Sequence, residues 1–388
     1  SMNDAISQAV HEKTEELVAL RRHLHAMPET AFEETATAEL IAERMNALGL
    51  STETGIGKTG VVAVLEGARP GPTLMIRADI DGLPVDEETG LEFASTNGAM
   101  HACGHDGHIS ILITAAEILV GMKDQLAGKV VFLFQPAEET ISGAAAMIDD
   151  GVLDRYQADR TIGLHIMNVL PLGTIATNRG PLMSGGIRFE IAIEGPGGHA
   201  GWPHETIDPV VVGSQIVMAL QTVVSRETSP MIPGVLTIGS FKTDSPAGNI
   251  ISKKAELQGS VRAFDVDELN RMYDAIQRIA TGVGEAGRAK ITVTEQQRIR
   301  PTVNDVGVAD WLSGIAEQVV GEGAAEVEPV TGGEDMSEFL HRIPGAFFFI
   351  GGETEGAEVH HSPKFDFDEK SLPTGVELFV RATADYLS

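Results

Sequence analysis

The order of predicted strands and helices is the feature that most limits how this chain can fold. Apolar residues recur at helical spacing in Glu15–Leu24 and Ala36–Leu50. Further along, apolar strands alternate with helical patterns; the strands are Val61–Leu65, Thr73–Ile76, Lys129–Phe134 and Thr161–Ile166, and the helices are 109–121 and Gly143–Leu153. This alternation predicts an α/β domain built on a largely parallel sheet.

The order changes near residue 185, where a strand, a helix, two strands, a helix and a strand follow one another. These elements are Ile187–Ile193, Asp208–Arg226, Val235–Phe241, Lys254–Phe264, Val266–Val283 and Lys290–Thr294. The order matches a ferredoxin-like split unit of about 110 residues. A helix at 305–321, a strand at Gly345–Ile350 and a terminal helix come after it. We therefore predict one α/β domain, residues 1–184 and 297–388, interrupted by an inserted α+β domain at 185–296.

The charge balance excludes several classes of partner. Lys+Arg 28 against Asp+Glu 56 gives a net charge of −28, which repels nucleic acid and anionic lipid.

The single cysteine cannot form an internal disulfide and fits a reducing compartment. The sequence contains no run of about 18 apolar residues, so it predicts no transmembrane helix. Residues 1–8 lack the pattern of a signal peptide. We expect a soluble, cytoplasmic protein.

Histidine clusters give the first indication of chemistry. Eight of the 12 histidines fall in short groups, which are His101, His105 and His108; His165; His199 and His204; and His360 and His361. Cys103 and His105 are two residues apart, so a thiolate and an imidazole could bind metal from one loop. Such donors suit Zn²⁺, Mn²⁺ or Co²⁺. A buried structural cysteine flanked by surface histidines is the alternative.

Acidic residues follow predicted strands at two places. Glu138 and Glu139 come directly after a strand, where α/β sheets bind ligands, and one could bind metal while the other moves protons. A solvated acidic turn is the alternative for this pair. Asp79 also ends a strand and could instead form a turn. His165, within an apolar strand, could instead be a core histidine.

Several short motifs taken together carry a family resemblance. They span nearly the whole chain and are Arg21-Arg-His-Leu-His25-Ala-Met-Pro28-Glu29, Arg77-Ala-Asp79-Ile-Asp-Gly-Leu-Pro84, His101-Ala-Cys-Gly-His-Asp-Gly-His108, Gln135-Pro-Ala-Glu-Glu139, Gly163-Leu-His165, Gly197-Gly-His199-Ala200, Gly332-Gly-Glu-Asp335 and His361-Ser-Pro363-Lys-Phe365. The chain resembles the metal-dependent amidohydrolase and aminoacylase family, which includes hippurate hydrolases, N-acyl-amino-acid amidohydrolases and auxin-conjugate hydrolases. That family is related to the dinuclear zinc carboxypeptidases and desuccinylases.

The resemblance implies a site for two divalent metal ions, Mn²⁺, Zn²⁺, Co²⁺ or Ni²⁺. It places Cys103 as the bridging ligand, His105 and His165 on one ion, and Glu139 and His361 on the other. Relatives that are peptidases have an aspartate at the bridge, so Cys103 indicates the amidohydrolase branch. The implied fold is a dinuclear-metal exopeptidase-like catalytic domain of the α/β class, with an inserted ferredoxin-like α+β domain that serves as lid and dimerisation domain.

Further roles also follow from the resemblance. Glu138 is expected to be the general base and Asp79 the carboxylate that orients a ligand histidine. In the inserted domain, His199 is expected to stabilise the oxyanion, and Asn249 and Arg262 to bind the substrate carboxylate. Arginine suits that task because its planar fork pairs bidentately with a carboxylate. An ordinary strand-surface residue is the alternative for Arg262.

The remaining motif histidines and the overall activity complete the expectations. His25, Pro28 and Glu29 are expected to shape the wall of the site, and His108 and His360 to be structural. The expected reaction is hydrolysis of the amide of a small-molecule N-acyl-amino acid, hippurate-like or N-acetylated, by a homodimer or higher homo-oligomer. A metallo-dipeptidase or carboxypeptidase on the same scaffold is one alternative. A non-catalytic metal-dependent binding protein is the other, although it would have no use for a base such as Glu138.

Overall fold

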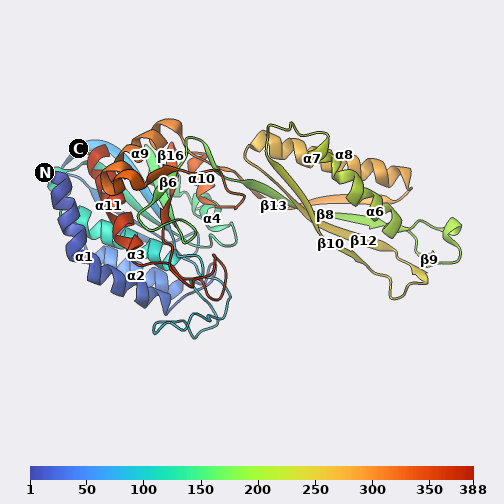
Figure 1. The fold of residues 1–388 in the computed structure, drawn as a ribbon, viewed down its shortest axis with the longest axis horizontal. Helices are drawn as coiled ribbons and strands as arrows, with labels where there is room; N and C mark the ends of the chain where they lie inside the picture. Colours follow the sequence, from blue (N-terminus) through green and yellow to red (C-terminus); the bar gives the residue numbers. More distant parts are fainter. The chain divides into compact units, whose positions relative to one another are not determined.

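The computed structural model describes residues 1–388, which form two compact units (Figure 1). The first unit comprises Ser1–Leu182, Val303–Glu328 and Glu334–Ser388. The second comprises Met183–Thr302 and Pro329–Gly333, a short segment that lies outside the predicted insertion at 185–296. No helix is both long enough and apolar enough to cross a membrane.

The first unit is built on an eight-stranded sheet with the order β1-β2-β4-β3-β5-β16-β6-β15. Its strands are β1 (Ser51–Ile56), β2 (Gly60–Glu66), β3 (Arg69–Asp79), β4 (Ala127–Gln135), β5 (Arg160–Met167), β6 (Ile175–Thr177), β15 (Ala324–Glu326) and β16 (Gly345–Gly351). The central strands β4, β3, β5 and β16 are parallel, whereas β1 and β2 are antiparallel to their neighbours. The predicted largely parallel sheet is therefore mixed towards its edges.

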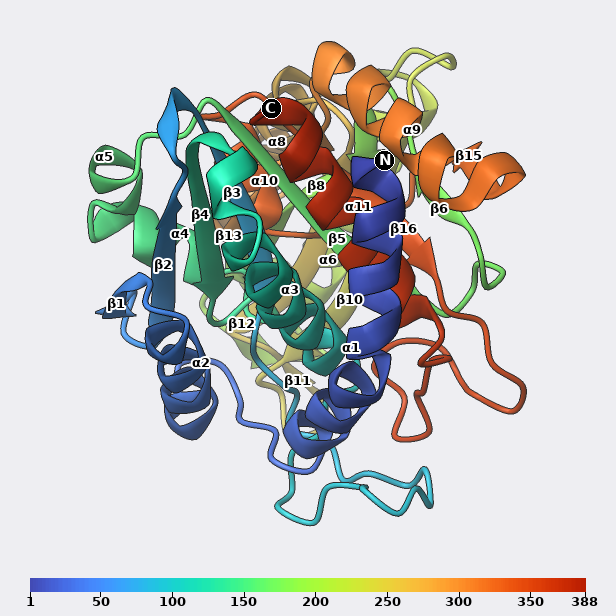
Figure 2. The same ribbon diagram turned by 90° about the vertical axis from the view of Figure 1, so that its left-hand side faces the viewer.

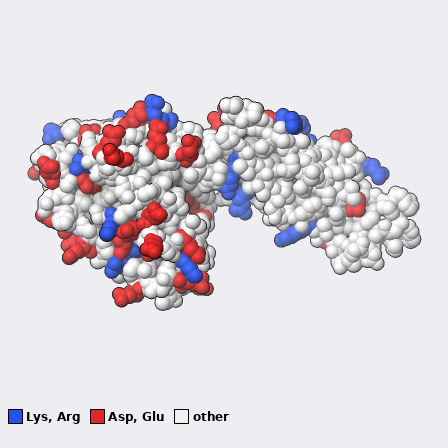
Figure 3. All heavy atoms as spheres, in the orientation of Figure 1, with Lys and Arg blue, Asp and Glu red and all other residues white.

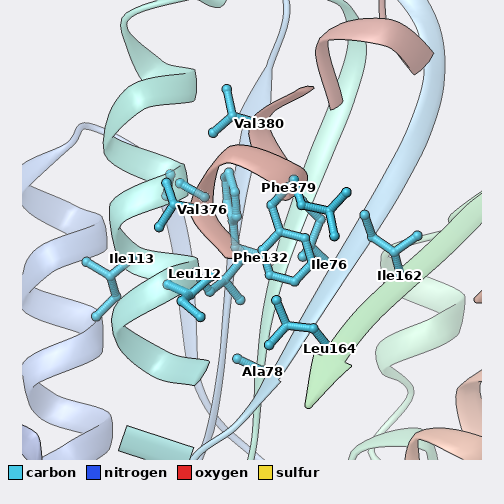
Figure 4. Close-up of a cluster of buried hydrophobic side chains, with 14 of the residues drawn as sticks. Ile76, Ala78, Leu112, Ile113, Phe132, Ile162, Leu164, Val376, Phe379 and Val380 are labelled. Atoms are coloured by element: carbon cyan, nitrogen blue, oxygen red, sulfur yellow. The ribbon is translucent and has the colours of Figure 1, made fainter. Parts of the chain in front are cut away.

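Three long helices of the first unit, α1 (Met2–His25), α3 (His105–Val120) and α11 (Ser371–Tyr386), pack against one another (Figure 2). The other helices are α2 (Thr35–Ala47), α4 (Gly143–Asp149), α5 (Val152–Arg155), α9 (Val306–Val320) and α10 (Met336–Leu340). Strand side chains such as Ile76 and Phe132 meet helix side chains such as Leu112 and Phe379 in the core (Figure 4). Acidic side chains are scattered over the visible face of this unit (Figure 3).

The second unit has a four-stranded antiparallel sheet of order β10-β12-β8-β13. Its elements are β8 (Gly185–Glu194), α6 (Pro209–Leu220), α7 (Thr222–Ser225), β10 (Gly234–Thr243), β12 (Lys254–Ala263), α8 (Val266–Ala286) and β13 (Lys290–Ile299). The predicted βαββαβ order is present, and the strand order is that of a ferredoxin-like fold. Two small sheets pair β9 (Gly198–His199) with β11 (Ile250–Ile251) and β7 (Pro181–Met183) with β14 (Thr302–Val303).

Some predicted helices have different limits in the structure. The helix predicted at Gly143–Leu153 is two short helices, because Gly151 adopts the left-handed conformation with φ of 85° between them. The helix predicted at Asp208–Arg226 is also divided, into α6 and α7. Helix α3 begins at His105, four residues before the predicted start at 109.

Candidate metal centre

The site forms where the parallel strands of the first unit end. Asp79 is the last residue of β3 and lies opposite Gln135, the last residue of β4. The segment that follows β4 carries Glu138 and Glu139, and β5 carries His165 near its own carboxyl end. The carboxyl ends of parallel strands are where α/β sheets bind ligands. The strand order therefore gathers residues that are far apart in the sequence.

A left-handed glycine separates two of the predicted ligands. Gly104 has φ of 81° and precedes the first residue of α3, which is His105. This conformation is accessible to glycine and unfavourable for most other residues. It lets the chain turn sharply into the helix between Cys103 and His105. Both side chains are buried, and both lie close to His165. The distance from Cys103 Sγ to His165 Nε2 is 3.5 Å.

The structure brings all five predicted metal ligands together. Cys103, His105 and His165 form one group, and Cys103, Glu139 and His361 form another, with the donor atoms of each group within 4.8 Å of one another. Nε2 of His361 lies 3.1 Å from Oε2 of Glu139. Cys103 is the residue common to both groups, which is the position that a bridging ligand requires.

The hydrogen bonds of two ligand histidines leave Nε2 available for a cation. Nδ1 of His105 donates to the carbonyl oxygen of Asp81 at 2.8 Å, and Nδ1 of His165 donates to that of Ile166 at 2.8 Å. A carbonyl oxygen only accepts, so Nδ1 carries a proton in both rings, and Nε2 is the nitrogen that can bind a cation once it is deprotonated. Backbone and carboxylate partners of this kind commonly orient metal-binding imidazoles.

The donor chemistry fits divalent ions. Nε2 of His105 and Oε1 of Glu139 are buried without a hydrogen-bond partner, although buried polar atoms almost always have one. Thiolate, imidazole and carboxylate donors together suit Zn²⁺ and its neighbours among the transition metals. Burial and the charge of Glu139 raise the pKa of the Cys103 thiol well above its usual range. A cation at this place would favour the thiolate instead.

Glu138 is buried beside other carboxylates. One carboxylate oxygen of Glu138, one of Asp79 and one of Glu334 all lie within 4.8 Å of one another. Burial, followed by the charges of Glu334 and Glu139, raises the pKa of Glu138 well above its usual range. A carboxyl group that readily holds a proton is suited to moving protons at neutral pH. The position therefore matches the predicted base.

Asp79 contacts two histidines in a way that the sequence did not predict. Its Oδ1 accepts a 2.6 Å hydrogen bond from Nδ1 of His108, and its Oδ2 lies 3.2 Å from Nε2 of His105. The carboxylate that bonds Nδ1 of His105 belongs to Asp81, with Oδ1 at 3.1 Å. Burial opposes ionisation of Asp79, but His105, His108 and Arg77 keep its pKa well below the usual range.

Three residues near the centre had no predicted role in positioning the ligands, namely Asp81, His108 and His360. Oδ2 of Asp81 accepts from the backbone N–H of Glu139 at 2.9 Å. The Ile166 backbone donates to Nε2 of His108 at 2.9 Å, and its carbonyl accepts from Nε2 of His360 at 2.8 Å. These contacts run through backbone atoms, which leave no signal in the residue types. Of the three residues, only Asp81 could have been indicated by the sequence, through its position two residues after Asp79.

Arg77 joins three of the motif segments. It is fully buried and forms a bidentate pair with Glu334 at 2.9 and 3.3 Å. It also donates to Asp335 at 3.0 Å and to the side chain of Gln135 at 2.8 Å. Burial, together with the charge of Glu334, raises the pKa of Asp335 to about 8. The guanidinium thus holds the ends of β3 and β4 to the segment that starts at Glu334.

His25 lies in a buried ionic chain that includes Asp106, the residue that follows the predicted ligand His105. Nδ1 of His25 bonds Oδ2 of Asp106 at 2.8 Å, and Nε2 bonds both oxygens of Glu87 at 2.9 Å. Arg21 donates to the same Asp106 oxygen at 2.9 Å. Carboxylates accept at both ring nitrogens, so His25 is held as an imidazolium. Burial opposes this charge, but the two carboxylates raise the pKa of His25 to about 9.

We predict that the free energy of unfolding falls as the pH rises into the alkaline range, because His25 loses its proton there. Its folded pKa of about 9 exceeds its unfolded value of 6.5, so its contribution is complete below pH 6.5 and disappears as the pH rises through 9. The shift corresponds to about 3 kcal/mol of unfolding free energy at ~1.4 kcal/mol per pKa unit. Urea unfolding of wild type and His25→Gln from pH 6 to 10 should show their difference shrinking with pH. A difference independent of pH would contradict this, and His204→Gln, an exposed histidine, is the control.

The other predicted site residues lie in the second unit. His199 and Asn249 are neighbours there, because β9 pairs with β11 and the backbone N–H of Ala200 donates to the Asn249 carbonyl at 3.1 Å. Arg262 is on β12 and donates from Nη1 to the carbonyl of Thr331 at 3.3 Å. His199 is exposed, and its Nδ1 accepts from the backbone N–H of Gly201 at 2.9 Å, which places the ring proton on Nε2.

Comparison with known proteins identifies the family. The model of peptidase family M20/M25/M40 matches residues 75–385. N-acetyl-L-cysteine deacetylase of Bacillus subtilis is 38% identical over 92% of this chain and 85% of its own length. Thermostable carboxypeptidase 1 of Saccharolobus solfataricus is 37% identical over 96% of this chain and 95% of its own length. The crystal structure of the YXEP protein of Bacillus subtilis, described as a dinuclear metal binding peptidase, superposes with a TM-score of 0.84 at 32% identity, covering 97% and 99%.

These matches run through the segments that carry the buried donor groups and confirm the resemblance, the fold class and the prediction of an enzyme. They also exclude the alternative of a non-catalytic binding protein. The chain belongs to peptidase family M20/M25/M40, and it is a hydrolase that acts on amide bonds.

Proposed function

We propose that this protein hydrolyses the amide bond of N-acyl-amino acids, releasing a carboxylate and a free amino acid, with the help of two divalent metal ions. The observation that carries the proposal is the sharing of Cys103 between two donor groups with Glu138 beside them. Support comes from a relative that is an N-acetyl-L-cysteine deacetylase and from a similar structure described as dinuclear.

The residues of the first unit would divide the work. His105 and His165 would hold one ion, Glu139 and His361 the other, and Cys103 both. Two such ions, Mn²⁺, Zn²⁺, Co²⁺ or Ni²⁺, would polarise the scissile carbonyl and lower the pKa of the attacking water. Glu138 would take a proton from that water and return it to the leaving amine. Asp79 would keep His108 in place through the hydrogen bond from its Nδ1, and Asp81 would orient the neighbouring His105.

The residues of the second unit would bind the substrate. Nε2–H of His199 is the free donor of its ring, and we assign it to the oxyanion that develops on the carbonyl oxygen. We assign Asn249 and Arg262 to the substrate carboxylate. The guanidinium donates from Nη1 to the carbonyl of Thr331, which leaves most of its five N–H groups for a carboxylate.

Two further proposals concern the state of the protein. We propose a homodimer formed through the second unit, where β10 is an edge strand with Val235 and Phe241 exposed. We also propose a cytoplasmic location, because Cys103 must stay reduced to bind metal.

Carboxypeptidase activity is the second candidate, because a thermostable carboxypeptidase is 37% identical to this chain. A screen of N-acyl-amino acids and dipeptides with each of the four metal ions, read out by release of free amine, separates the two. We expect N-acyl-amino acids to be the better substrates. Turnover of free dipeptides alone would overturn the proposal.

We predict that the fully loaded protein contains two metal ions per chain. Because Cys103 belongs to both donor groups, Cys103→Ala should lower the metal content measured by elemental analysis, whereas His204→Ala, at an exposed histidine, should not. Fewer than one ion per wild-type chain would contradict the two-ion site.

A further inference from the structure

A buried glutamate directly before α2 contacts the loop that follows β4 and carries Glu138 and Glu139. Oε2 of Glu34 accepts from the backbone N–H of Ala137 at 2.9 Å, and its Oε1 accepts from the hydroxyl of Thr59 at 3.2 Å. The side chain of Glu34 has no exposed surface. Burying a carboxyl group is unfavourable unless hydrogen bonds offset the loss of water. The contact to Ala137 is therefore a built feature of the fold.

Glu34 stands at the position of a helix cap without serving as one. A side chain directly before a helix usually accepts from the first free N–H groups of that helix, but Glu34 makes no such bond to α2. Glu29 does so instead, because its two carboxylate oxygens accept from the N–H groups of Ala36 and Thr37 at 3.1 and 2.6 Å. The carboxyl group of Glu34 is thus left to contact the loop after β4.

The residue that Glu34 contacts has an unusual backbone conformation. Ala137 has φ of 50°, in the left-handed region, which residues other than glycine rarely adopt and keep only where their surroundings enforce it. Its carbonyl accepts from the N–H groups of Ser142 and Gly143 at 3.2 and 3.1 Å, so both of its backbone polar groups are bonded. A β-carbon on Gly143 would overlap the carbonyl oxygen of Pro136, so the loop is tightly closed. The conformation of Ala137 therefore fixes the direction in which the chain enters the next residue, the proposed base.

The two glutamates that follow Ala137 are held by different carboxyl groups. The backbone N–H of Glu139 donates to Oδ2 of Asp81 at 2.9 Å, which is a contact that does not involve Glu34. The contact made by Glu34 lies one residue before Glu138. Removal of the Glu34 carboxyl group should therefore displace Glu138 more than Glu139.

We propose that Glu34 is a positioning residue for amide hydrolysis, which holds Ala137 in its left-handed conformation and so keeps the carboxylate of Glu138 in place to accept a proton. This inference rests on the proposed function, because it requires Glu138 to be the base. The task needs an accepting oxygen at the end of a side chain of this length, and it does not need a negative charge. Burial raises the pKa of Glu34 to about 7, and a neutral carboxyl group still has an oxygen that accepts.

The first experiment measures kcat, KM and metal content of three Glu34 variants with an N-acyl-amino acid as substrate. Alanine has no acceptor and aspartate is one methylene too short to reach Ala137. Both variants should lose kcat by about tenfold, less than the ~10²-fold expected without the base, and should keep their KM and their metal. Glutamine keeps an accepting oxygen at the same distance, so Glu34→Gln should recover most of this loss. Thr59→Val is the matched control, because it removes only the other hydrogen bond of Glu34 and should not change kcat.

Three results would overturn the inference. An unchanged kcat in both Glu34→Ala and Glu34→Asp would show that Glu34 does not position the base. A loss in Glu34→Gln as large as in Glu34→Ala would show that the charge and not the acceptor matters. Loss of metal from these variants would assign Glu34 to the ligand Glu139. A wild-type protein that hydrolyses no N-acyl-amino acid, or a normal kcat in Glu138→Gln, would instead refute the proposed function.

A double-mutant cycle separates positioning from a general effect on the fold. If Glu34 acts through Glu138, Glu34→Ala should lower the residual kcat of Glu138→Gln by less than about twofold, because there is no longer a base to position. A further loss of about tenfold would show that Glu34 acts by another route and would overturn the inference. Urea unfolding checks that each variant is folded under assay conditions, and Glu34→Asp takes the place of Glu34→Ala in the cycle if the alanine variant does not fold.

Discussion

Glu138→Gln is expected to keep its metal and lose kcat by about 10²-fold or more, because the amide cannot take a proton from the attacking water. Glu138 is buried next to the donor groups, and its replacement by glutamine keeps the shape of the side chain. KM should change little, since the proton moves only during the reaction. Elemental analysis and steady-state kinetics on the same preparation measure both quantities.

Glu139→Gln is the matched comparison for this prediction. Oε2 of Glu139 lies 3.1 Å from Nε2 of His361 within the second donor group, so this variant should lose metal as well as activity. The contrast between neighbouring glutamates tests the division of labour directly. Equal metal loss in the two variants, or full activity of Glu138→Gln, would show that the roles of the pair are wrongly assigned.

His199→Ala is expected to lower kcat by about 10²–10³-fold, the usual effect of removing one oxyanion donor. The proposed ligands belong to the first unit and His199 to the second, so metal content should not change. A normal kcat would show that His199 has no part in the reaction. His199→Asn is a useful second variant, because an amide retains a donor and should recover part of the loss.

Mixing variants would show whether His199 acts in its own chain or in a partner. Unfolded and refolded together, His199→Ala and Glu138→Gln chains should regain activity only if one chain supplies His199 to the other within the proposed dimer. If His199 acts within its own chain, the mixture should stay inactive. A wild-type mass of one chain by light scattering would refute the dimer.

The main strands and helices could be predicted because their apolar periodicity reflects burial. β4 and β16 are buried almost throughout and read as continuous apolar runs. β1 could not be predicted, because its sequence Ser-Thr-Glu-Thr-Gly-Ile is exposed or half-buried apart from Ile56, and pairing with β2 rather than its own pattern makes it a strand.

The donor groups that the structure brings together could be recognised because their chemistry shows in the residue types. Cys103, His165 and Glu139 are recognisable as donors once their motifs are placed together. His108 could not be recognised, since its role depends on which backbone N–H faces it, and only the position of Asp81 two residues after Asp79 indicates that residue. Such contacts come from the packing of distant segments. The sequence therefore indicates the side chains that could bind metal, but not the atoms that orient them.

The interrupted first unit has a consequence for synthesis on the ribosome. β16 lies between β5 and β6 in the sheet, yet it follows β5 by the whole length of the second unit in the sequence. The ends of the second unit are adjacent, with Gly186 opposite Ile299, so this unit can complete its own sheet as soon as β13 emerges. His361 emerges later still. Nascent chains can therefore fold the insertion first, and they cannot complete the proposed dinuclear site until the polypeptide is almost finished.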